Sequence, residues 1–118
     1  MCIRDRAVDN LDEILAVPGI DAVYVGPADL SISLGLPPAS DHEHPDFNGA
    51  IEAIVAGCQA RGIVPGIHTH ERLVAKRLEQ GFRMITVTSD RIAVGSGAAA
   101  ALAIARSDDQ VDGEGSIY

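Results

Sequence analysis

The stretch Gly26-Pro27-Ala28-Asp29 places a carboxylate beside a backbone that can receive an anion. Pro27 suits the first position of a helix, because its φ is already set and it has no N–H to leave unpaired. The first turn of a helix presents unpaired N–H groups and the positive end of the helix dipole, which favour an anion. A carboxylate beside that anion can hold a divalent metal ion against a bound oxoacid. The simpler alternative is that Asp29 only stabilises the helix start, by about 0.3–1 kcal/mol.

The four histidines form two His-x-His pairs, His42 with His44 and His68 with His70. Residues i and i+2 of extended backbone lie on one face, so either pair could bind Zn²⁺. This pattern favours, as an alternative, a zinc-dependent hydrolase on an amidohydrolase-like barrel. His42 and His44 lie in a polar loop, where solvent exposure is the simpler interpretation. His68 directly follows an expected strand, and it is therefore the candidate for substrate contact or catalysis.

The elements that must position these residues alternate along the chain. Apolar segments predict three strands, and apolar residues at helical spacing predict four helices around them. Strands that alternate with helices through short connections predict right-handed crossovers and a parallel sheet. The loops after such strands carry the chemistry in barrels and in open sheets. The expected strands are 22–25, 63–67 and 84–88, and the expected helices begin near residues 9, 45, 70 and 90.

Two of these helices have more specific expectations. In the helix over 70–80, Thr69 is the expected cap, and the residues expected to point inward are Leu73, Val74 and Leu78. The charged outer face is expected to consist of Arg72, Lys76 and Arg77 with Glu71 and Glu79. The last helix is expected to run from Ser89 or Asp90 to about Arg106. Its Gly95-Ser96-Gly97 segment is expected to interrupt it, because each glycine costs about 1 kcal/mol of helix propensity relative to Ala.

Composition limits the partners. The chain has 118 residues and a formal net charge of −8, so it is long enough for one domain but shorter than a complete barrel of about 250 residues. The negative charge argues against nucleic acid and anionic membranes, because both require clustered Lys and Arg. No apolar run is long enough to span a bilayer, and no signal-peptide pattern is visible. Cys2 and Cys58 are far apart, and a reduced, cytoplasmic protein is the simplest interpretation.

The two ends differ from the rest of the chain. Residues 1–6, Met-Cys-Ile-Arg-Asp-Arg, look unrelated to the helical pattern that follows and resemble a translated sequencing-adaptor remnant, so we expect a non-native leader there. Residues 107–118 are acidic and glycine-rich, and they are expected to form a mobile tail. The domain organisation predicted from these patterns places the folded part at 7–106.

Within that part, residues 19–31, Gly-Ile-Asp-Ala-Val-Tyr-Val-Gly-Pro-Ala-Asp-Leu-Ser, resemble the signature of the HpcH/HpaI aldolase family. His44-Pro45, residues 62–67 and Gln80-Gly81-Phe82 are similar to later segments of that family in the same order. The resemblance implies an α/β fold, the C-terminal part of a TIM (β/α)8 barrel. It implies a class II aldolase that cleaves or forms 4-hydroxy-2-oxo acids from pyruvate and an aldehyde. It also implies Mg²⁺ or Mn²⁺, with Co²⁺ as a further option, and a homo-oligomer, commonly a hexamer, in which the last helix packs on a neighbouring subunit.

The resemblance assigns site residues by position. Asp29 matches the metal-ligating aspartate, and Gly26, Pro27, Ala28 and Asp29 match the segment that receives the pyruvate carboxylate and the metal. A chelated divalent ion would stabilise the enolate formed in retro-aldol cleavage. The second metal-ligating Glu of the family lies just upstream of Ala7, and its catalytic His and substrate-binding Arg lie in the N-terminal half. We therefore expect this chain to be inactive alone, and the full-length parent to be an enzyme.

Two further interpretations stay open. An acyl-CoA lyase of the citrate lyase type shares the barrel and the resemblance does not distinguish it. A non-catalytic remnant or oligomerisation module is the other, because part of a barrel exposes two sheet edges that can pair with another chain. The upstream reading frame would discriminate, since an aldolase requires a strand that ends in Glu there.

Overall fold

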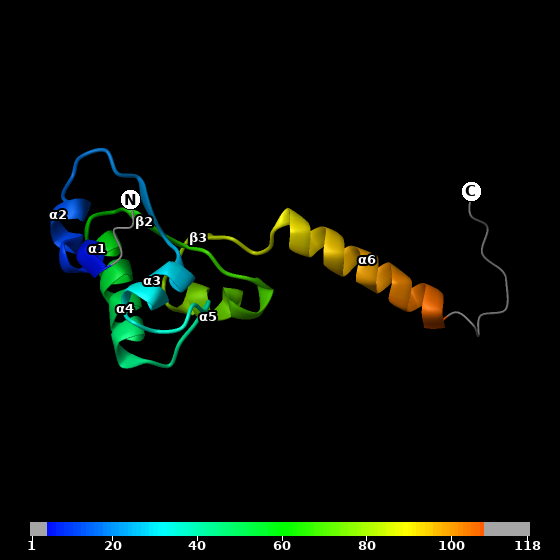
Figure 1. The fold of residues 1–118 in the computed structure, drawn as a ribbon. Coiled ribbons are helices and arrows are strands. Elements are labelled where there is room, and N and C mark those ends of the chain that lie inside the picture. Colours follow the sequence, from blue (N-terminus) through cyan, green and yellow to red (C-terminus); the bar gives the residue numbers. More distant parts are fainter. Residues whose placement is uncertain (1–4, 108–118) are drawn as a thin grey trace. The chain divides into compact units, whose positions relative to one another are not determined.

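The computed structural model describes residues 5–107, and residues 1–4 and 108–118 lie outside the described part (Figure 1). The chain divides into two compact units, one ending at Val87 and one beginning at Thr88, and each is described by itself. The predicted leader falls partly on the first helix, which begins at Asp5, and the predicted tail lies almost wholly outside the described residues.

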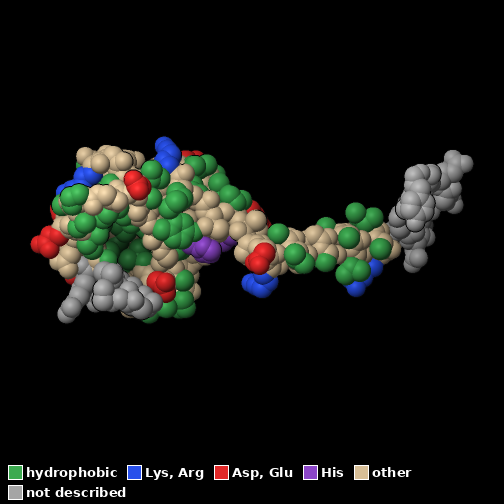
Figure 2. Space-filling model, turned by 90° about the horizontal axis from the view of Figure 1, so that it is seen from above, with side chains coloured by type: hydrophobic (Ala, Val, Ile, Leu, Met, Phe, Trp, Pro, Cys, Tyr) green, Lys and Arg blue, Asp and Glu red, His purple; other side chains and the backbone are tan. Residues whose placement is uncertain are grey.

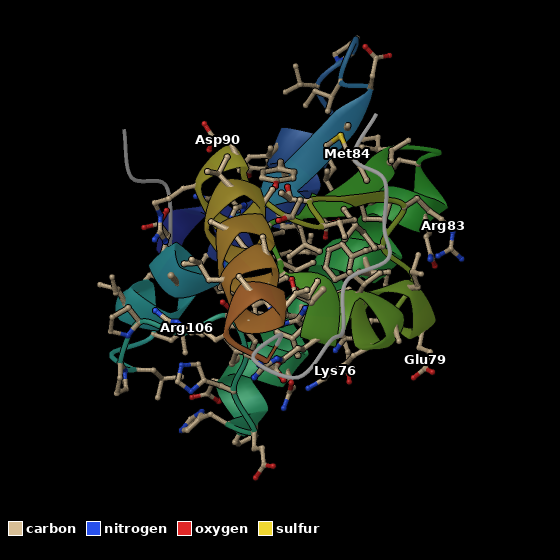
Figure 3. The ribbon with its side chains drawn as sticks, turned by 90° about the vertical axis from the view of Figure 1, so that its right-hand side faces the viewer. Lys76, Glu79, Arg83, Met84, Asp90 and Arg106 are labelled. Carbon is tan, nitrogen blue, oxygen red and sulfur yellow. The ribbon has the colours of Figure 1, made fainter. Side chains whose placement is uncertain are left out.

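The first unit contains a three-stranded parallel sheet with strand order β1-β2-β3. The strands are β1 (Ala22–Val25), β2 (Val64–Ile67) and β3 (Met84–Ile85). Their register pairs Tyr24 with Gly66 and Gly66 with Met84, so these three residues lie side by side on one face. The prediction of three parallel strands is confirmed. Figure 3 shows Met84 beside β1, whereas the adjacent Arg83 points away from it.

Short helices flank the strands. The bounds are α1 (Asp5–Asp9), α2 (Leu11–Leu15), α3 (Pro27–Ser33), α4 (Pro45–Ala60), the 3-10 helix η1 (Glu71–Leu73), α5 (Val74–Glu79) and α6 (Asp90–Ser107). The helix expected to begin near residue 9 is α2, which follows Asn10, and the short helix α1 precedes it as an element that the sequence did not predict. The helix expected over 70–80 is a 3-10 turn followed by six α-helical residues. The predicted helices at 45–60 and from 90 are confirmed in place and length.

The core lies between α4 and one face of the sheet. Phe47, Ile51 and Cys58 of α4 are fully buried, as are Ile67 of β2 and Phe82 just before β3. These apolar residues recur at helical spacing in α4, and each fully buried Ile or Phe contributes about 1.5–3 kcal/mol by leaving water. The sheet's other face is more open, since Tyr24 is 48% and Met84 39% exposed.

Three expectations about the chain between β2 and β3 are wrong. Thr69 is buried and its hydroxyl has no hydrogen-bond partner, so it caps no helix. Leu78 is 47% exposed, whereas Arg77 is fully buried, the reverse of the predicted orientation. Strand β3 ends at Ile85 instead of Thr88, because β2 also ends at Ile67 and offers no further strand to pair with.

The second unit contains α6. Ser89 caps it by accepting a hydrogen bond from the Ile92 N–H at 3.4 Å, as predicted. The helix runs without a break through Gly95 and Gly97, so the expected interruption is wrong, and Ser96 donates to the Ile92 carbonyl within the same turn. Its apolar side chains are exposed, Val94 by 72% (Figure 2). Among the described residues, no helix is both long and apolar enough to cross a membrane.

Candidate functional site

The corner between β1 and α3 carries the predicted site. Gly26 is extended and precedes the helix, and Pro27 occupies its first turn. Asp29 follows on the exposed side of that turn. A Cβ atom added to Gly26 would lie 3.1 Å from Asp29 Oδ2 and 3.6 Å from Asp29 Cβ. The Asp29 carboxylate therefore lies over Gly26, and a larger residue at position 26 would crowd it.

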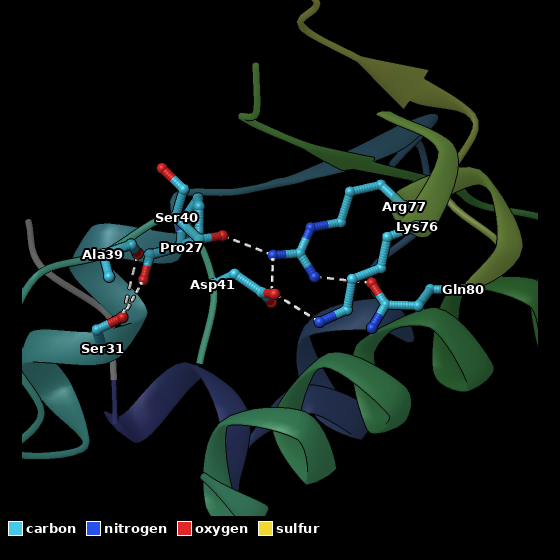
Figure 4. Close-up of polar contacts among 8 residues, drawn as sticks. All are labelled: Pro27, Ser31, Ala39, Ser40, Asp41, Lys76, Arg77 and Gln80. Atoms are coloured by element: carbon cyan, nitrogen blue, oxygen red, sulfur yellow. Dashed lines mark hydrogen bonds and ion pairs between the residues drawn. The ribbon is translucent and has the colours of Figure 1, made fainter. Parts of the chain in front are cut away.

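The buried side of helix α3 holds the helix in place against the core. Pro27, Leu30 and Ser31 are buried, whereas Asp29 is exposed. The Ser31 hydroxyl donates to the Pro27 carbonyl at 2.7 Å and to the Ala39 carbonyl at 3.3 Å (Figure 4). These contacts hold the first turn of α3 and the loop that follows it, so the Asp29 carboxylate stands at a defined place on the rim.

His68 lies next to this corner on the neighbouring strand. Its backbone N–H donates to the Val25 carbonyl at 2.9 Å, which continues the pairing of β1 with β2 beyond the last strand residue. Its side chain is exposed, with Nδ1 3.4 Å from the Tyr24 hydroxyl. The structure therefore brings Gly26, Asp29 and His68 to one end of the sheet, as the parallel topology predicted.

Sequence reasoning missed two residues at this end of the sheet. The Tyr24 hydroxyl of β1 forms hydrogen bonds with His68, which follows β2, and with Thr86, which follows β3. The sequence does contain a signal for Tyr24, because it alternates with Val23 and Val25, which pack against the core, and so must face away from it. Thr86 was assigned only to a strand, and its position opposite Tyr24 depends on the register.

The other histidines have local roles. His42 donates through Nε2–H to the Pro37 carbonyl at 2.8 Å and packs edge-on against Phe47, with ring centroids 5.3 Å apart. His44 precedes α4, and its Nδ1 accepts from the Asp46 N–H at 3.3 Å, so it is a helix cap. His70 precedes η1 and is half-buried. Neither pair converges with other ligands, since no three His, Cys, Asp or Glu side chains of residues 5–107 gather at one point.

The Asp29 corner fits part of a metal site. A carboxylate oxygen held at a sheet end is the kind of ligand that Mg²⁺ or Mn²⁺ prefers. In the described part of the chain it is not joined by two further acidic or imidazole ligands. A divalent ion bound here therefore needs ligands from elsewhere, in addition to Asp29.

Behind the site, the charged face predicted on the helix over 70–80 is exposed as expected at Glu71, Arg72 and Glu79. Arg77 is instead the buried member of an ion-pair cluster, and Lys76 beside it stays 42% exposed. Arg77 Nη2 donates to Asp41 Oδ1 at 3.0 Å and to the Ser40 carbonyl, and Arg77 Nη1 donates to Gln80 (Figure 4). Lys76 binds the other oxygen of Asp41. Burial alone would raise the pKa of Asp41, but the hydrogen bonds and charges of Lys76 and Arg77 outweigh it and lower that pKa below 3.8.

Comparison with known proteins gives the family. The family model described as HpcH/HpaI aldolase/citrate lyase matches residues 4–95. The chain belongs to this family. A curated relative, the 4-hydroxy-2-oxo-heptane-1,7-dioate aldolase of Salmonella paratyphi B, is 37% identical over 114 residues, which are 96% of this chain and 43% of that relative. This HpcH/HpaI family chain therefore spans less than half the length of the relatives it matches.

Solved structures agree with this assignment. An HpcH/HpaI aldolase/citrate lyase family protein from Burkholderia cenocepacia is 36% identical with a TM-score of 0.74, over 86% of this chain and 39% of that one. The HpcH/HpaI aldolase from Desulfitobacterium hafniense is 29% identical with a TM-score of 0.70, over 94% and 42%. The fold of this family chain, three parallel strands with helices, thus matches part of those TIM-barrel structures, as the resemblance implied.

Proposed function

We propose that this chain is the C-terminal part of a divalent-metal-dependent class II aldolase that cleaves or forms 4-hydroxy-2-oxo acids, with pyruvate as one product. The observation that carries the proposal is the Asp29 carboxylate, which lies over Gly26 at the end of a parallel sheet in a chain of the HpcH/HpaI family. The name of the Salmonella relative, a 4-hydroxy-2-oxo-heptane-1,7-dioate aldolase, supports the same reaction class.

In this proposal Asp29 supplies one oxygen ligand to Mg²⁺ or Mn²⁺, or to Co²⁺. The segment Gly26-Pro27-Ala28, which leads from β1 into α3, receives the ketoacid carboxylate, as the family resemblance assigns it. A bound divalent ion stabilises negative charge that develops on the ketoacid oxygen. The protein's contribution is to fix the carboxylate and the backbone before the substrate arrives, which Ser31 and the buried side of α3 support.

The chain alone is proposed to be inactive. The family resemblance places a second metal-ligating Glu, a catalytic His and a substrate-binding Arg upstream of Ala7, and this chain covers 43% of its Salmonella relative. A site with one ligand binds metal weakly, and without a base there is no route to the enolate. Activity therefore belongs to the full-length protein, in which Asp29 and the upstream residues meet.

The experiment compares pyruvate release from 4-hydroxy-2-oxo-heptane-1,7-dioate by the full-length protein and by this chain, each with Mn²⁺ or Mg²⁺. We expect turnover only by the full-length protein, and a loss of at least about a hundredfold in Asp29→Asn, because a ligand to the charge-stabilising ion is removed. Asp21→Asn is the matched control, since Asp21 is an exposed carboxylate that precedes the same strand. Turnover by this chain alone that Asp29→Ala abolishes would contradict the inactivity proposal, and release from a citryl-CoA-type thioester instead would favour the acyl-CoA lyase.

We also propose that α6 packs on a neighbouring subunit of a homo-oligomer. The support is its exposed apolar side chains, Ile92, Val94, Leu102 and Ile104, which are costly to leave in water. Val94→Asp with Leu102→Asp should then lower the oligomer's mass in light scattering of the full-length protein. A full-length protein that is monomeric before the substitutions would contradict this part of the proposal.

A further inference from the structure

A buried arginine holds the loop that leads away from the Asp29 corner. Residues 34–44 connect α3 to α4 without a helix or a strand. Arg77 of α5 donates through Nη2 to both the Ser40 carbonyl and the Asp41 carboxylate of this loop (Figure 4). One guanidinium therefore joins α5 to the backbone of the loop as well as to one of its side chains.

The same loop contacts the helix that carries Asp29. The buried Ser31 hydroxyl of α3 donates to the Ala39 carbonyl at 3.3 Å. Ser31 lies two residues after Asp29, which belongs to the first turn of that helix. The loop thus contacts α3 at Ala39 and Arg77 at Ser40, the next residue. A shift of the loop would therefore move a support of the turn that presents the Asp29 carboxylate.

Burial of the Arg77 side chain does not favour stability. The side chain is fully buried, and among the described residues its Nε has no hydrogen-bond partner. Removing a guanidinium from water and leaving a buried N–H unpaired both cost free energy. In some proteins such buried charged groups select one geometry instead of adding stability, and the contacts of Arg77 favour that role here. Because this chain alone already buries Arg77, that burial does not depend on the rest of a barrel.

The neighbouring cation, Lys76, holds the loop in a different way. It binds the other oxygen of the Asp41 carboxylate, and its side chain is 42% exposed. Within residues 5–107 this is its hydrogen bond to the loop, whereas Arg77 also binds the loop backbone. Ion pairs of exposed side chains contribute little. The two residues carry the same charge, so comparing them separates the effect of the backbone contact from the effect of charge.

We propose that Arg77 is a positioning residue for Asp29, and that it makes the metal site selective for Mn²⁺ and Mg²⁺ against Ca²⁺. This inference rests on the proposed function, in which Asp29 binds the ion, and it adds what keeps that ligand in place. Mg²⁺ and Mn²⁺ take octahedral oxygen ligands, and Mg²⁺ requires near-ideal geometry, whereas Ca²⁺ accepts flexible geometry. A carboxylate held at one place therefore favours the smaller ions, and loosening its support reduces that preference.

The test measures metal binding to the full-length protein without substrate. The electron paramagnetic resonance signal of free Mn²⁺ gives the Kd for Mn²⁺, and displacement of bound Mn²⁺ by Ca²⁺ gives the Kd for Ca²⁺. The variants are Arg77→Met, which removes the guanidinium, and Arg77→Lys, which keeps the charge but loses the rigid fork of donors. Lys76→Met is the matched control, because it removes the same charge from beside the same carboxylate. Ile54→Val, at a buried position of α4, is the control for a general loss of stability.

We expect both Arg77 variants to raise the Kd for Mn²⁺ about fivefold to tenfold, near the low end of the effect of groups that support metal ligands. The Kd for Ca²⁺ should change by less than about twofold, so the ratio of the Ca²⁺ constant to the Mn²⁺ constant should fall. Lys76→Met and Ile54→Val should leave that ratio within about twofold of the wild type. Circular dichroism checks folding, and Arg77→Lys, which leaves a cation beside Asp41, decides the test if Arg77→Met does not fold.

The outcomes separate this inference from the proposed function. A ratio that stays constant in the folded Arg77 variants, or that falls equally in Lys76→Met or in Ile54→Val, would overturn the role of Arg77 and leave the aldolase proposal standing. Mn²⁺ binding that is absent from the wild type, or that is as tight in Asp29→Asn as in the wild type, would overturn Asp29 as the metal ligand. That result would remove the proposed function, and the role of Arg77 with it.

Discussion

Arg77 and Asp41 form an ion pair that joins α5 to the loop between α3 and α4, with Nη2 and Oδ1 3.0 Å apart. The Arg77 side chain is fully buried, and that of Asp41 is 25% exposed. Lys76 binds the second oxygen of the same carboxylate. On its other side, the loop contacts Ser31 of α3 through the Ala39 carbonyl. Residues 39–41 thus connect the helix that carries Asp29 to the helix that follows β2.

Asp41→Ala should destabilise the first unit. It leaves a buried guanidinium without its anion, and loss of one partner of a buried pair costs about 3–5 kcal/mol. Because Asp41 is partly exposed, we expect a loss of about 2 kcal/mol in the free energy of unfolding, measured by urea denaturation at pH 7. Glu79→Ala is the control, since Glu79 is an exposed acid on α5, the helix that carries Arg77. An equal effect of both substitutions would contradict a specific role for the pair.

The same carboxylate predicts a pH dependence. The pKa of Asp41 is lowered in the folded chain by Lys76 and Arg77, in spite of its burial, so its ion pair is fully formed above the unfolded value of 3.8. As the pH falls below that value the unfolded chain takes up a proton first, and this share of the stability is lost through the lower folded pKa. The difference in unfolding free energy between the wild type and Asp41→Asn should be largest near pH 7 and shrink below pH 3.8. A difference that stays constant between pH 7 and pH 3 would refute the assignment.

Alanine substitutions at Gly66 and Gly49 should change the free energy of unfolding in opposite directions. Gly66→Ala places a Cβ 2.6 Å from the Met84 methyl and 3.0 Å from the Val23 carbonyl, so we expect a loss of about 1–3 kcal/mol from overpacking. Gly49 lies within α4 with open space around it, so Gly49→Ala should raise the stability by about 0.5–1 kcal/mol. Thermal unfolding followed by circular dichroism measures both. Stabilisation by Gly66→Ala would show that Met84 and Tyr24 move aside without cost.

Cys58 should be unreactive while the chain is folded. Its side chain is fully buried in α4, and burial raises the pKa of its thiol, so little thiolate forms near neutral pH. In Cys2→Ser, which leaves Cys58 as the single thiol of the sequence, labelling by a disulfide reagent at pH 8 should be on the order of a hundredfold slower than in urea. Equal labelling rates in buffer and in urea would mean that α4 opens freely.

The sequence predicted those helices and turns that are specified by residues close to one another along the chain. Helix α4 begins at Pro45 and carries its buried residues at helical spacing, both of which are visible in the sequence. Gly26 and Pro27 likewise mark the turn from β1 into α3. The resemblance added the position of Asp29 as a candidate ligand, which no spacing rule distinguishes from a helix-start carboxylate.

The side-chain orientations that the sequence did not predict depend on partners far away along the chain. Arg77 was expected on the outer face, but its partner Asp41 lies 36 residues earlier in a loop with no regular pattern. Burial of Arg77 then turns the neighbouring Leu78 toward solvent. The hydrogen bonds of Tyr24 also depend on register, since Thr86 lies 62 residues later. Pairings of this kind require the fold before they can be seen.

Strand β2 separates two kinds of positions that an engineer would want to vary independently. Pro65 and Ile67 are buried, whereas His68, on the opposite face, is exposed. Combinatorial libraries limited to positions 24, 68 and 86 of this chain should therefore yield mostly folded proteins, and the sequence tolerance of this face could be mapped at nearly constant stability.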